Sequence, residues 1–531
     1  MAPPRPTIAT PAAHVGRPSP LRGARELIRL ALRRDRLRLT LWFTGIVGMV
    51  AVVASSMRSL YDTPAERREY AELVEGNATM IVQSGPGYGL DDPTSGAVLA
   101  NELGIWVFIA VALMNVFVVV RHTRTEEATN RTELVRAAPV GRAAGTAAAL
   151  AVSSWSTLLV ASGSALSLIA LGLPTVGSLA FGAAIIGIGH VFAGVAAVAA
   201  QLTENPRSAL GLGGAVLALS FVLRAVGDVG DGTLSWLSPI GWAQGTRAYA
   251  DERWWVLGLA AVSTVALVEV ATVLQRHRDH GSGMIASRGG PATGAPWMST
   301  PVGLTFRLQR ASIISWSIGA GLVAFFYGII SDQAESILES YPEMEEYFLG
   351  SGDASITDLF LSRSITTMAL FAAGFSVASV LRLRTEEITE RAGSILATPT
   401  SRTRWAVEHL VVTAVGTTCV LAAVGAATGL GVAATGGSLG TVAELTGAAV
   451  TLAPALFLLG AATFALVGVG PRAALVASGA YSAVVVIGVF GELLSFPRVV
   501  LNVSPFEHLR VPPADRVDLI PVGLLLGASA A

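Results

Sequence analysis

The sequence predicts an all-α polytopic membrane protein with about 12 transmembrane helices, arranged as two parallel six-helix repeats. Of the 531 residues, 52% are hydrophobic and only 14% are charged, whereas a soluble domain carries roughly 25% charged residues. The apolar residues fall in runs of about 20, the length that a helix needs to cross a bilayer. A segment beginning RTEE occurs twice, at 124 and at 384. A duplicated helical membrane domain accounts for all three observations.

The N-terminal region divides into two parts. Residues 1–20 are rich in Pro and small residues without an apolar period, which predicts a disordered cytoplasmic N-terminus. Residues 21–38 repeat Leu and Ala at helical spacing among many Arg, which predicts an amphipathic helix on an anionic inner leaflet. The apolar run 39–57 has a counterpart in the middle of the chain, so we interpret it as a span and not as a signal peptide.

Twelve apolar runs are candidates for membrane spans, and the last of them is short. We expect spans at 39–57, 98–120, 146–171, 175–200, 208–226 and 254–274, then at 311–330, 363–381, 405–432, 441–468, 474–491 and 516–531. The first six-span repeat therefore covers 39–274 and the second covers 311–531. A linker at 275–310 joins them.

The distribution of Arg predicts the orientation, because Arg-rich loops stay on the cytoplasmic side. The Arg-rich segments are 1–38 with nine Arg, and 121–142, 275–310 and 382–404 with five each. In contrast, 58–97 holds seven acidic residues against three Arg, and 331–362 holds eight and no Arg. We therefore expect a multi-pass cell-membrane protein with cytoplasmic termini and linker and two outward-facing acidic loops. Within the first loop, Thr63-Pro64-Ala65-Glu66 predicts a capped helix around 64–76.

The repeated segment is the most informative motif. RTEEATNRTELVRAAPVGR at 124–142 aligns without a gap with RTEEITERAGSILATPTSR at 384–402. We expect a cytoplasmic helix of three or four turns in each copy, with its carboxylates near the helix start, where the dipole favours them. Two symmetric copies suggest a two-fold symmetric partner beneath the membrane, and the alternative is a solvated loop held by i,i+4 ion pairs.

Further landmarks repeat in the same order. Ser238-Pro239 corresponds to Ser504-Pro505, and Trp42 and Gly45 correspond to Trp316 and Gly319. These matches place six spans of the same orientation in each half, which predicts a parallel repeat produced by duplication of one domain.

The composition excludes several kinds of chemistry. The chain contains no lysine, so it cannot form a P-loop, which needs a lysine on the phosphates, or a lysine Schiff base. Its one cysteine, Cys419, excludes an intrachain disulfide framework, and we expect a small buried side chain there. We find no HExxH, GxSxG or paired intramembrane Asp, so we expect no catalytic residue, no metal site and no cofactor in this chain.

The chain resembles the permeases of ABC-2-type exporters. The segment rich in Glu and Arg before the third span of each repeat carries the resemblance, together with LIRLALRRDRLRL, VVRHTRTEE, WLSPIGW and SPFEHL. The chain is most similar to the fused actinobacterial permeases of the polyketide-antibiotic (tetronasin-like) exporter group. The resemblance covers nearly the whole chain except residues 1–20. The second repeat departs from the first at Glu507 and His508, which stand opposite Gly241 and Trp242.

The resemblance implies a role for each segment. Residues 21–38 would be an elbow helix at the inner interface, and the linker 275–310 would hold a second one. The polar stretches around Ser238-Pro239 and Ser504-Pro505 would be outer re-entrant regions. The repeated segments would be coupling helices that dock on a homodimer of a separate ABC ATPase, which would bind ATP and Mg. The coupling residues would be Arg124, Glu126, Glu127, Arg131, Glu133, Pro139, Arg142, Arg384, Glu386, Glu387, Arg391, Pro399 and Arg402.

The predicted function is therefore ATP-driven export of a hydrophobic or amphipathic small molecule, such as an antibiotic, a drug or a lipid-like compound, with no nucleic-acid partner. The candidates for cargo contacts are His190, Phe117, Phe192, Phe371 and Phe375. Two alternatives remain open. A proton-coupled secondary exporter would need intramembrane relays, for which His190 is the one deep candidate. A polytopic membrane enzyme would need clustered ionisable groups.

Overall fold

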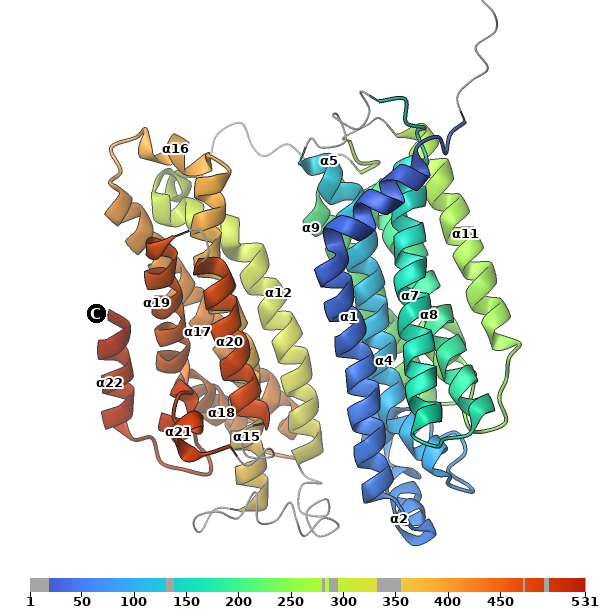
Figure 1. Cartoon of the computed structure of the whole chain (residues 1–531). Coiled ribbons are helices and arrows are strands. Elements are labelled where there is room, and N and C mark those ends of the chain that lie inside the picture. The colour runs from blue at the N-terminus through green and yellow to red at the C-terminus, as the bar shows by residue number, and fades with distance from the viewer. Residues whose placement is uncertain are drawn as a thin grey trace, which may run out of the picture. The chain divides into compact units, whose positions relative to one another are not determined.

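The computed structural model describes residues 19–129, 138–278, 282–285, 295–331, 355–470, 473–490 and 496–530. It consists of two compact units, unit 1 (Met1–Gly289) and unit 2 (Gly290–Ala531). The boundary falls within the segment 275–310. The described residues are almost entirely helical and contain no strand, which confirms the all-α prediction (Figure 1).

The described residues of unit 1 form six long helices in the order predicted for the first repeat. They are α1 (Ala24–Leu60), α4 (Ser95–Val120), α7 (Ala144–Ala170), α8 (Thr175–Leu202), α9 (Pro206–Val229) and α11 (Val256–His277). Short elements connect them: α2 (Pro64–Val74), α3 (Ala78–Ser84), η1 (Arg121–Thr125), α5 (Glu126–Ala128), η2 (Leu234–Leu237) and α10 (Pro239–Gly245).

Unit 2 repeats this order. Its long helices are α12 (Pro301–Ile330), α15 (Ile356–Ile388) and α17 (Arg402–Ala434). They are followed by the interrupted pair α18 (Gly440–Val450) and α19 (Ala453–Val469) and by the shorter helices α20 (Ala473–Phe490) and α22 (Leu519–Ala530). Short elements are η3 (Pro296–Ser299), α16 (Arg391–Leu396), α21 (Arg498–Leu501) and η5 (Pro505–His508). The tenth predicted span is interrupted, since α18 ends at a two-residue turn just before Pro454, which lacks the N–H needed inside a helix.

Ten helices among the described residues are long and apolar enough to cross a membrane, with α18 and α19 together forming the tenth. The shorter apolar helices α20 and α22 coincide with the predicted eleventh and twelfth spans. The ten long helices and the two shorter ones together agree with the prediction of about 12 membrane helices.

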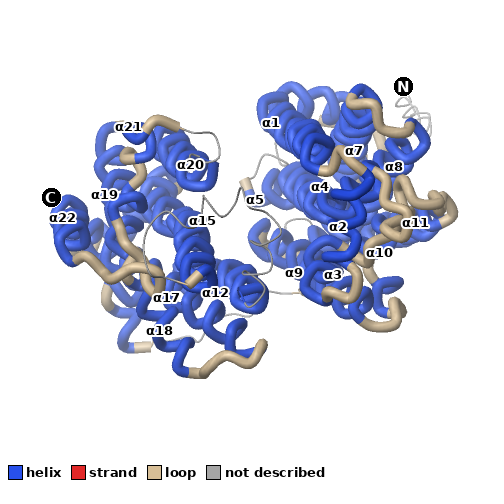
Figure 2. Tube along the Cα trace, turned by 90° about the horizontal axis from the view of Figure 1, so that it is seen from below, coloured by secondary structure: helices blue, strands red, loops and turns tan. Residues whose placement is uncertain are grey.

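Both units pack their helices by the same scheme. In unit 1, α4 contacts α1, α7, α8 and α9, and α11 packs against α8. In unit 2, α15 contacts α12, α17, α19 and α20, and α22 packs against α19. Figure 2, which looks along the helices, shows α4 and α15 among their neighbours. The second span is thus the central helix of each unit, and the repeat seen in the sequence is also a repeat of packing.

Small residues and paired polar side chains hold these helices together. In unit 2, α12 and α17 meet backbone to backbone, where Gly328 faces the carbonyl oxygen of Thr428 and the Cα of Gly431. In unit 1, Asn115 of α4 accepts hydrogen bonds from Ser153 and, at 3.0 Å, from Thr157 of α7. Both devices suit a lipid environment, where apolar attraction between helices disappears and close approach and hydrogen bonds remain.

Two expectations need comment. The amphipathic segment 21–38 and the first span are one continuous helix, α1, which bends in Figure 1. Its place at the membrane surface stays a prediction.

Cys419 is exposed on α17, so the expectation of a buried side chain is wrong. An apolar helix that faces lipid is apolar on its outer face too, so an apolar neighbourhood in the sequence does not imply burial.

The contact between Gly328 and α17 predicts the effect of a single methyl group. In Gly328→Ala the new Cβ would lie 2.1 Å from the Thr428 carbonyl oxygen, so the two helices must separate. We expect a loss of about 1–3 kcal/mol in stability, as for overpacked cores, measured by thermal unfolding of the purified chain. Gly319→Ala, on the same helix with open space around its Cβ, is the matched control. Equal unfolding of the two variants would contradict this close packing.

Candidate functional site at the RTEE ends of the units

The RTEE end of each unit is the end where Arg124–Glu127 or Arg384–Glu387 lie. In unit 1 the central helix α4 changes there into a π-helix, η1, over Arg121–Thr125, and then continues as α5. A π-helix is wider than an α-helix and is frequent at functional sites. In unit 2, α15 passes through the equivalent residues as a regular α-helix. The two RTEE ends are therefore built differently.

The α1 junction, formed by Arg34, Asp35, Arg121, His122 and Glu126, joins the Arg-rich part of α1 to η1 and α5. Asp35 is only 4% exposed, and its carboxylate accepts hydrogen bonds of 2.5 and 2.7 Å from Arg121. The same carboxylate lies 3.1 Å from Nε2 of His122. Arg34 is ion paired with Glu126. A bidentate Arg–carboxylate pair fixes direction as well as distance, so α1 and the end of α4 are held in one geometry.

A second cluster ties the ends of three helices together. Arg124 is 1% exposed and donates to the carbonyl oxygens of Ala200, in the last turn of α8, and of Ser282, the latter at 2.8 Å. Its third contact is Glu127, at 2.8 Å. Glu127 also accepts hydrogen bonds of 2.8 and 3.0 Å from Arg278, just beyond α11. The ends of α4, α8 and α11 therefore share one network of charges.

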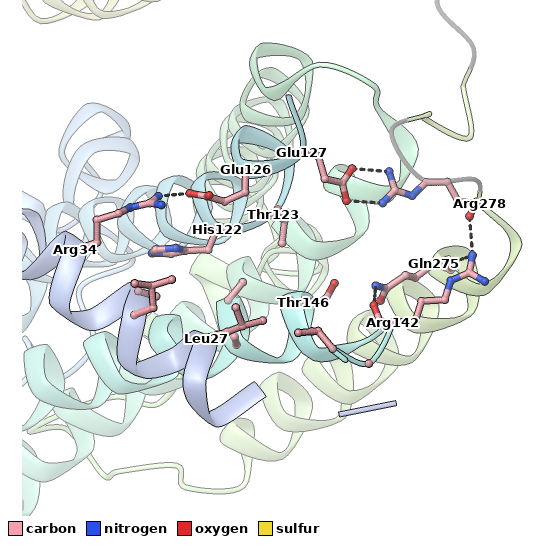
Figure 3. Close-up of a pocket in the computed structure, with 17 residues that line it drawn as sticks. Leu27, Arg34, His122, Thr123, Glu126, Glu127, Arg142, Thr146, Gln275 and Arg278 are labelled. Carbon is pink, nitrogen blue, oxygen red and sulfur yellow. Dashed lines mark hydrogen bonds and ion pairs between the residues drawn. The ribbon is translucent and has the colours of Figure 1, made fainter. Parts of the chain in front are cut away.

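A cavity of about 600 Å³ lies between these clusters, lined by α1, η1, α5 and the ends of α7 and α11 (Figure 3). Leu27, Leu30 and Ala31 of α1 contribute apolar lining, and the two Arg–Glu pairs contribute polar lining. Arg142 also lines it and donates to the carbonyl oxygens of Gln275 and Arg278, at 3.0 and 2.7 Å. Small-molecule sites typically measure about 300–1,000 Å³, so the cavity can hold a small molecule.

Comparison with known proteins identifies the family. The family model described as "Multidrug efflux system permease Rv1217c, C-terminal domain" matches residues 298–531. The chain is 35% identical over 529 residues to the multidrug efflux system permease protein Rv1217c of Mycobacterium tuberculosis, and the alignment covers 98% of this chain and 96% of the relative. The chain belongs to this permease family. The comparison thus confirms the prediction of a membrane permease, whereas the ABC-2-type and tetronasin-like assignments stay predictions.

The RTEE end of unit 2 corrects one expectation about the permease. Glu386 and Glu387 do not begin a helix but lie in the last turn of α15, and Glu126 and Glu127 likewise continue α4 through η1. Nothing in the segment LRLRTEEI breaks a helix. The two carboxylates lie at the C-terminal end of α15, where the negative end of the helix dipole disfavours them. Ion pairs of Glu386 with Arg382, at 3.4 Å, and with Arg391, at 3.9 Å, offset this cost. The break comes at Glu390, whose φ of 58° is left-handed and precedes the short helix α16.

Unit 2 also has an equivalent of the α1 junction, but a neutral one. The offset that aligns Trp42 with Trp316 places Gln309 opposite Asp35. Gln309 is buried, accepts from Ser379 and lies 3.1 Å from Nε2 of His409. Ser379 is also 2.6 Å from Thr413. The same place in the fold is thus held by charges in unit 1 and by uncharged hydrogen bonds in unit 2.

The predicted coupling residues fall into three classes of exposure. The exposed ones can contact a partner, whereas the buried ones hold the RTEE end in shape. Exposed are Pro139, Arg142, Glu387, Arg391, Pro399 and Arg402; partly buried are Glu126, Glu127 and Arg384; buried are Arg124 and Glu386. Arg131 and Glu133 lie outside the described residues. Coupling itself stays a prediction for all of them.

The candidates for cargo contacts also separate. Phe192 and Phe375 are fully buried in the unit cores, so neither can touch a cargo in this conformation. Phe117 and Phe371 are exposed on helix surfaces, and the ring of Phe117 stacks on Trp42 at 6.2 Å. The ring nitrogens of His190 are 2.8 Å from the Ile186 carbonyl oxygen and 3.0 Å from Oγ of Ser154 on α7. This histidine serves as a hydrogen-bonded packing residue in this conformation.

The far end of unit 1, opposite its RTEE end, carries α2 and a second polar cluster. Thr63 and Glu66 form the expected capping box of α2, which ends at Val74, and the hydrogen bond from the Thr63 N–H lowers the pKa of Glu66. Tyr70 of α2 donates to Glu102 at 2.7 Å, and burial raises the pKa of Tyr70.

Among the described residues, no group of three or more His, Cys, Asp or Glu could hold a metal ion.

Sequence reasoning missed the partners at the RTEE end of unit 1, although one signal was available. Asp35 stands in RRDRLR, surrounded by Arg on an otherwise basic helix. An acid in that setting is typical of a buried ion pair, since an exposed one would weaken attraction to an anionic leaflet. Its partner, Arg121, could not be identified because the pairing depends on how α1 packs against α4.

Removing the charge of Asp35 tests the α1 junction. In Asp35→Asn the side chain keeps its shape, but Arg121 and His122 lose their anionic partner. We expect the chain to lose about 2 kcal/mol of stability, since hydrogen bonds to charged groups contribute roughly 1.5–3 kcal/mol, measured by denaturant unfolding in mild detergent. Arg36→Gln, at an exposed position on the same helix, should unfold like the wild type. If both variants match the wild type, the pair does not hold α1.

Proposed function

We propose that the permease is the membrane subunit of an ABC-2-type exporter, which moves a hydrophobic or amphipathic small molecule out of the cell with energy from a separate ATPase. Its relative carries the name of a multidrug efflux system permease, which supports a drug-like cargo. The absence of lysine supports a separate energy source, because the chain has no residue to serve as a P-loop lysine. A homodimer of the ATPase would bind ATP and Mg beneath the two repeats.

The observation that carries this proposal is the continuity between the RTEE ends and the central helices. In unit 1 the RTEE residues directly continue α4, and in unit 2 they form the last turns of α15. Each of these two helices contacts four other spans of its unit. A partner that moves an RTEE end would therefore move the helix on which the rest of the unit packs.

The surface around α16 suits a protein partner. Ile388 is 68% exposed, and Arg391 begins α16 with its side chain 66% exposed. Both side chains are accessible at the junction of α15 and α16, on a segment too polar to enter lipid, so a protein partner can contact them. Gly393, on the same short helix, has open space around its Cβ, so this face can accept a bulky test residue without strain.

The proton-coupled alternative finds less support. A relay needs ionisable side chains within reach of one another across the membrane. His190 instead bonds to a backbone carbonyl and to a serine hydroxyl. Other ionisable groups lie toward the ends of long helices, as Arg224 does in the last turns of α9 and His409 in the first turns of α17.

A bulky residue on α16 tests partner docking. We expect Gly393→Trp to leave the fold intact, because nothing lies within 4 Å of its Cβ, but to reduce co-purification of the ATPase and ATP-driven export at least about tenfold, as loss of a central contact does. Gly447→Trp, at an exposed position of α18 with equal space, should keep both activities. ATP hydrolysis by the purified permease alone, or full export in Gly393→Trp, would count against the proposal.

Cysteine labelling tests the orientation. In a Cys419→Ser background, we expect Ser394→Cys on α16 to react with a membrane-impermeant maleimide only after cell lysis, because Arg-rich loops remain inside. Glu75→Cys, at the end of α2, should react in intact cells. The reverse labelling pattern would place the RTEE ends outside and would exclude docking to a cytoplasmic ATPase.

A further inference from the structure

The cavity at the RTEE end of unit 1 has a composition that an energy-coupling surface does not explain. We propose that it is a binding site for an amphiphile with an anionic head group, such as a phosphate ester. The cavity shares Glu126, Glu127 and Arg142 with the predicted coupling residues, but its lining comes from unit 1 alone, so binding can be measured without the ATPase. Its test therefore uses the permease by itself.

The charge of the lining favours an anion. Three Arg and two Glu line the cavity. Arg34 is paired with Glu126, and Arg278 is paired with Glu127. Arg142 differs, because within the described residues its guanidinium donates to two backbone carbonyls, which carry no net charge. The lining thus has one positive charge in excess, and an anion entering it gains Coulomb energy in a medium less polar than water.

The apolar lining favours a ligand with a tail. Leu27 and, one turn later, Leu30 and Ala31 lie on the side of α1 that faces the cavity. Leu30 keeps 55% of its surface exposed. Burying such surface stabilises a complex by about 25 cal/mol per Å², which an inorganic anion cannot use. Figure 3 shows Leu27 below the Arg34–Glu126 pair, so head and tail would contact different lining residues.

The ligand class follows from this combination. Basic pockets between helices on the cytoplasmic side bind the head groups of anionic lipids, and an acidic amphiphilic cargo would present the same chemistry. Both sources share an anionic head and an apolar tail of at least several carbons. A neutral or zwitterionic head would leave the charge of Arg142 without a counterion, so we expect amphiphiles with such head groups to bind more weakly than anionic ones.

Filling the cavity is the first test. Gly145 of α7 lines it, and nothing lies within 4 Å of a Cβ built there. Gly145→Leu should therefore fold, because a helical glycine is replaced by a good helix former, while its side chain takes up space needed by the ligand. Gly258→Leu, on α11, with equal space around its Cβ and away from the cavity, is the matched control.

Removing the excess charge is the second test. Arg142→Gln keeps an N–H that can donate to the carbonyl of Gln275 but removes the positive charge. Arg207→Gln, an exposed Arg on α9 that does not line the cavity, controls for loss of charge elsewhere. We expect Arg142→Gln to weaken binding of an anionic amphiphile about tenfold, the typical effect of losing one charge-assisted contact.

The measurement is the unfolding temperature of the full chain in a neutral detergent, titrated with phosphatidylglycerol, phosphatidylcholine, dodecyl phosphate or inorganic phosphate. We expect a saturable rise with an anionic amphiphile, lost in Gly145→Leu and kept in Gly258→Leu. A rise with phosphatidylglycerol alone assigns the site to a membrane lipid, and a rise with dodecyl phosphate alone assigns it to a single-chain ligand.

Three results would overturn the proposal. Equal stabilisation by phosphatidylcholine would show that the head-group charge is irrelevant. Equal stabilisation by inorganic phosphate would show that the apolar lining contributes nothing. A rise that survives in both Gly145→Leu and Arg142→Gln would place the binding on the exposed Arg of α1 instead of in the cavity.

Discussion

The permease depends on one constraint above all: a charged group that leaves water must find a partner of opposite charge or a set of hydrogen bonds. At the RTEE end of unit 1 this constraint decides which helices meet. Asp35 brings α1 to η1, and Arg124, Glu127 and Arg278 bring together the ends of α4, α8 and α11. Apolar matching alone would leave these helices free to slide, because lipid solvates their surfaces as well as a neighbouring helix does.

The two units satisfy this constraint in different ways. The α1 junction of unit 1 is charged, and its counterpart around Gln309 in unit 2 is neutral. Charged pairs weaken when water and salt reach them, whereas hydrogen bonds between neutral groups respond little to salt. The packing scheme is duplicated but the electrostatics are not, so the two repeats need not respond equally when their ends are displaced.

Features with a local cause could be predicted from the sequence. The length of the apolar runs predicts the spans, and the identical residues around RTEE and Trp42 predict the two repeats. The capping box at Thr63 follows from four adjacent residues. What could not be predicted depends on contacts between distant segments. The burial of Arg124 needs Ala200 and Ser282, and the extension of α15 through Glu386 needs Arg382 and Arg391.

The π-helix of unit 1 sets the register of every residue that follows it on the central helix. A π turn holds about one more residue than an α turn. If η1 returned to regular α geometry, every residue beyond it would rotate by about 100° around the axis, the angle of one helical residue. Glu126 would then swing away from Arg34, and Glu127 away from Arg278. α15 stores no such extra residue, so this register shift is available to only one half of the permease.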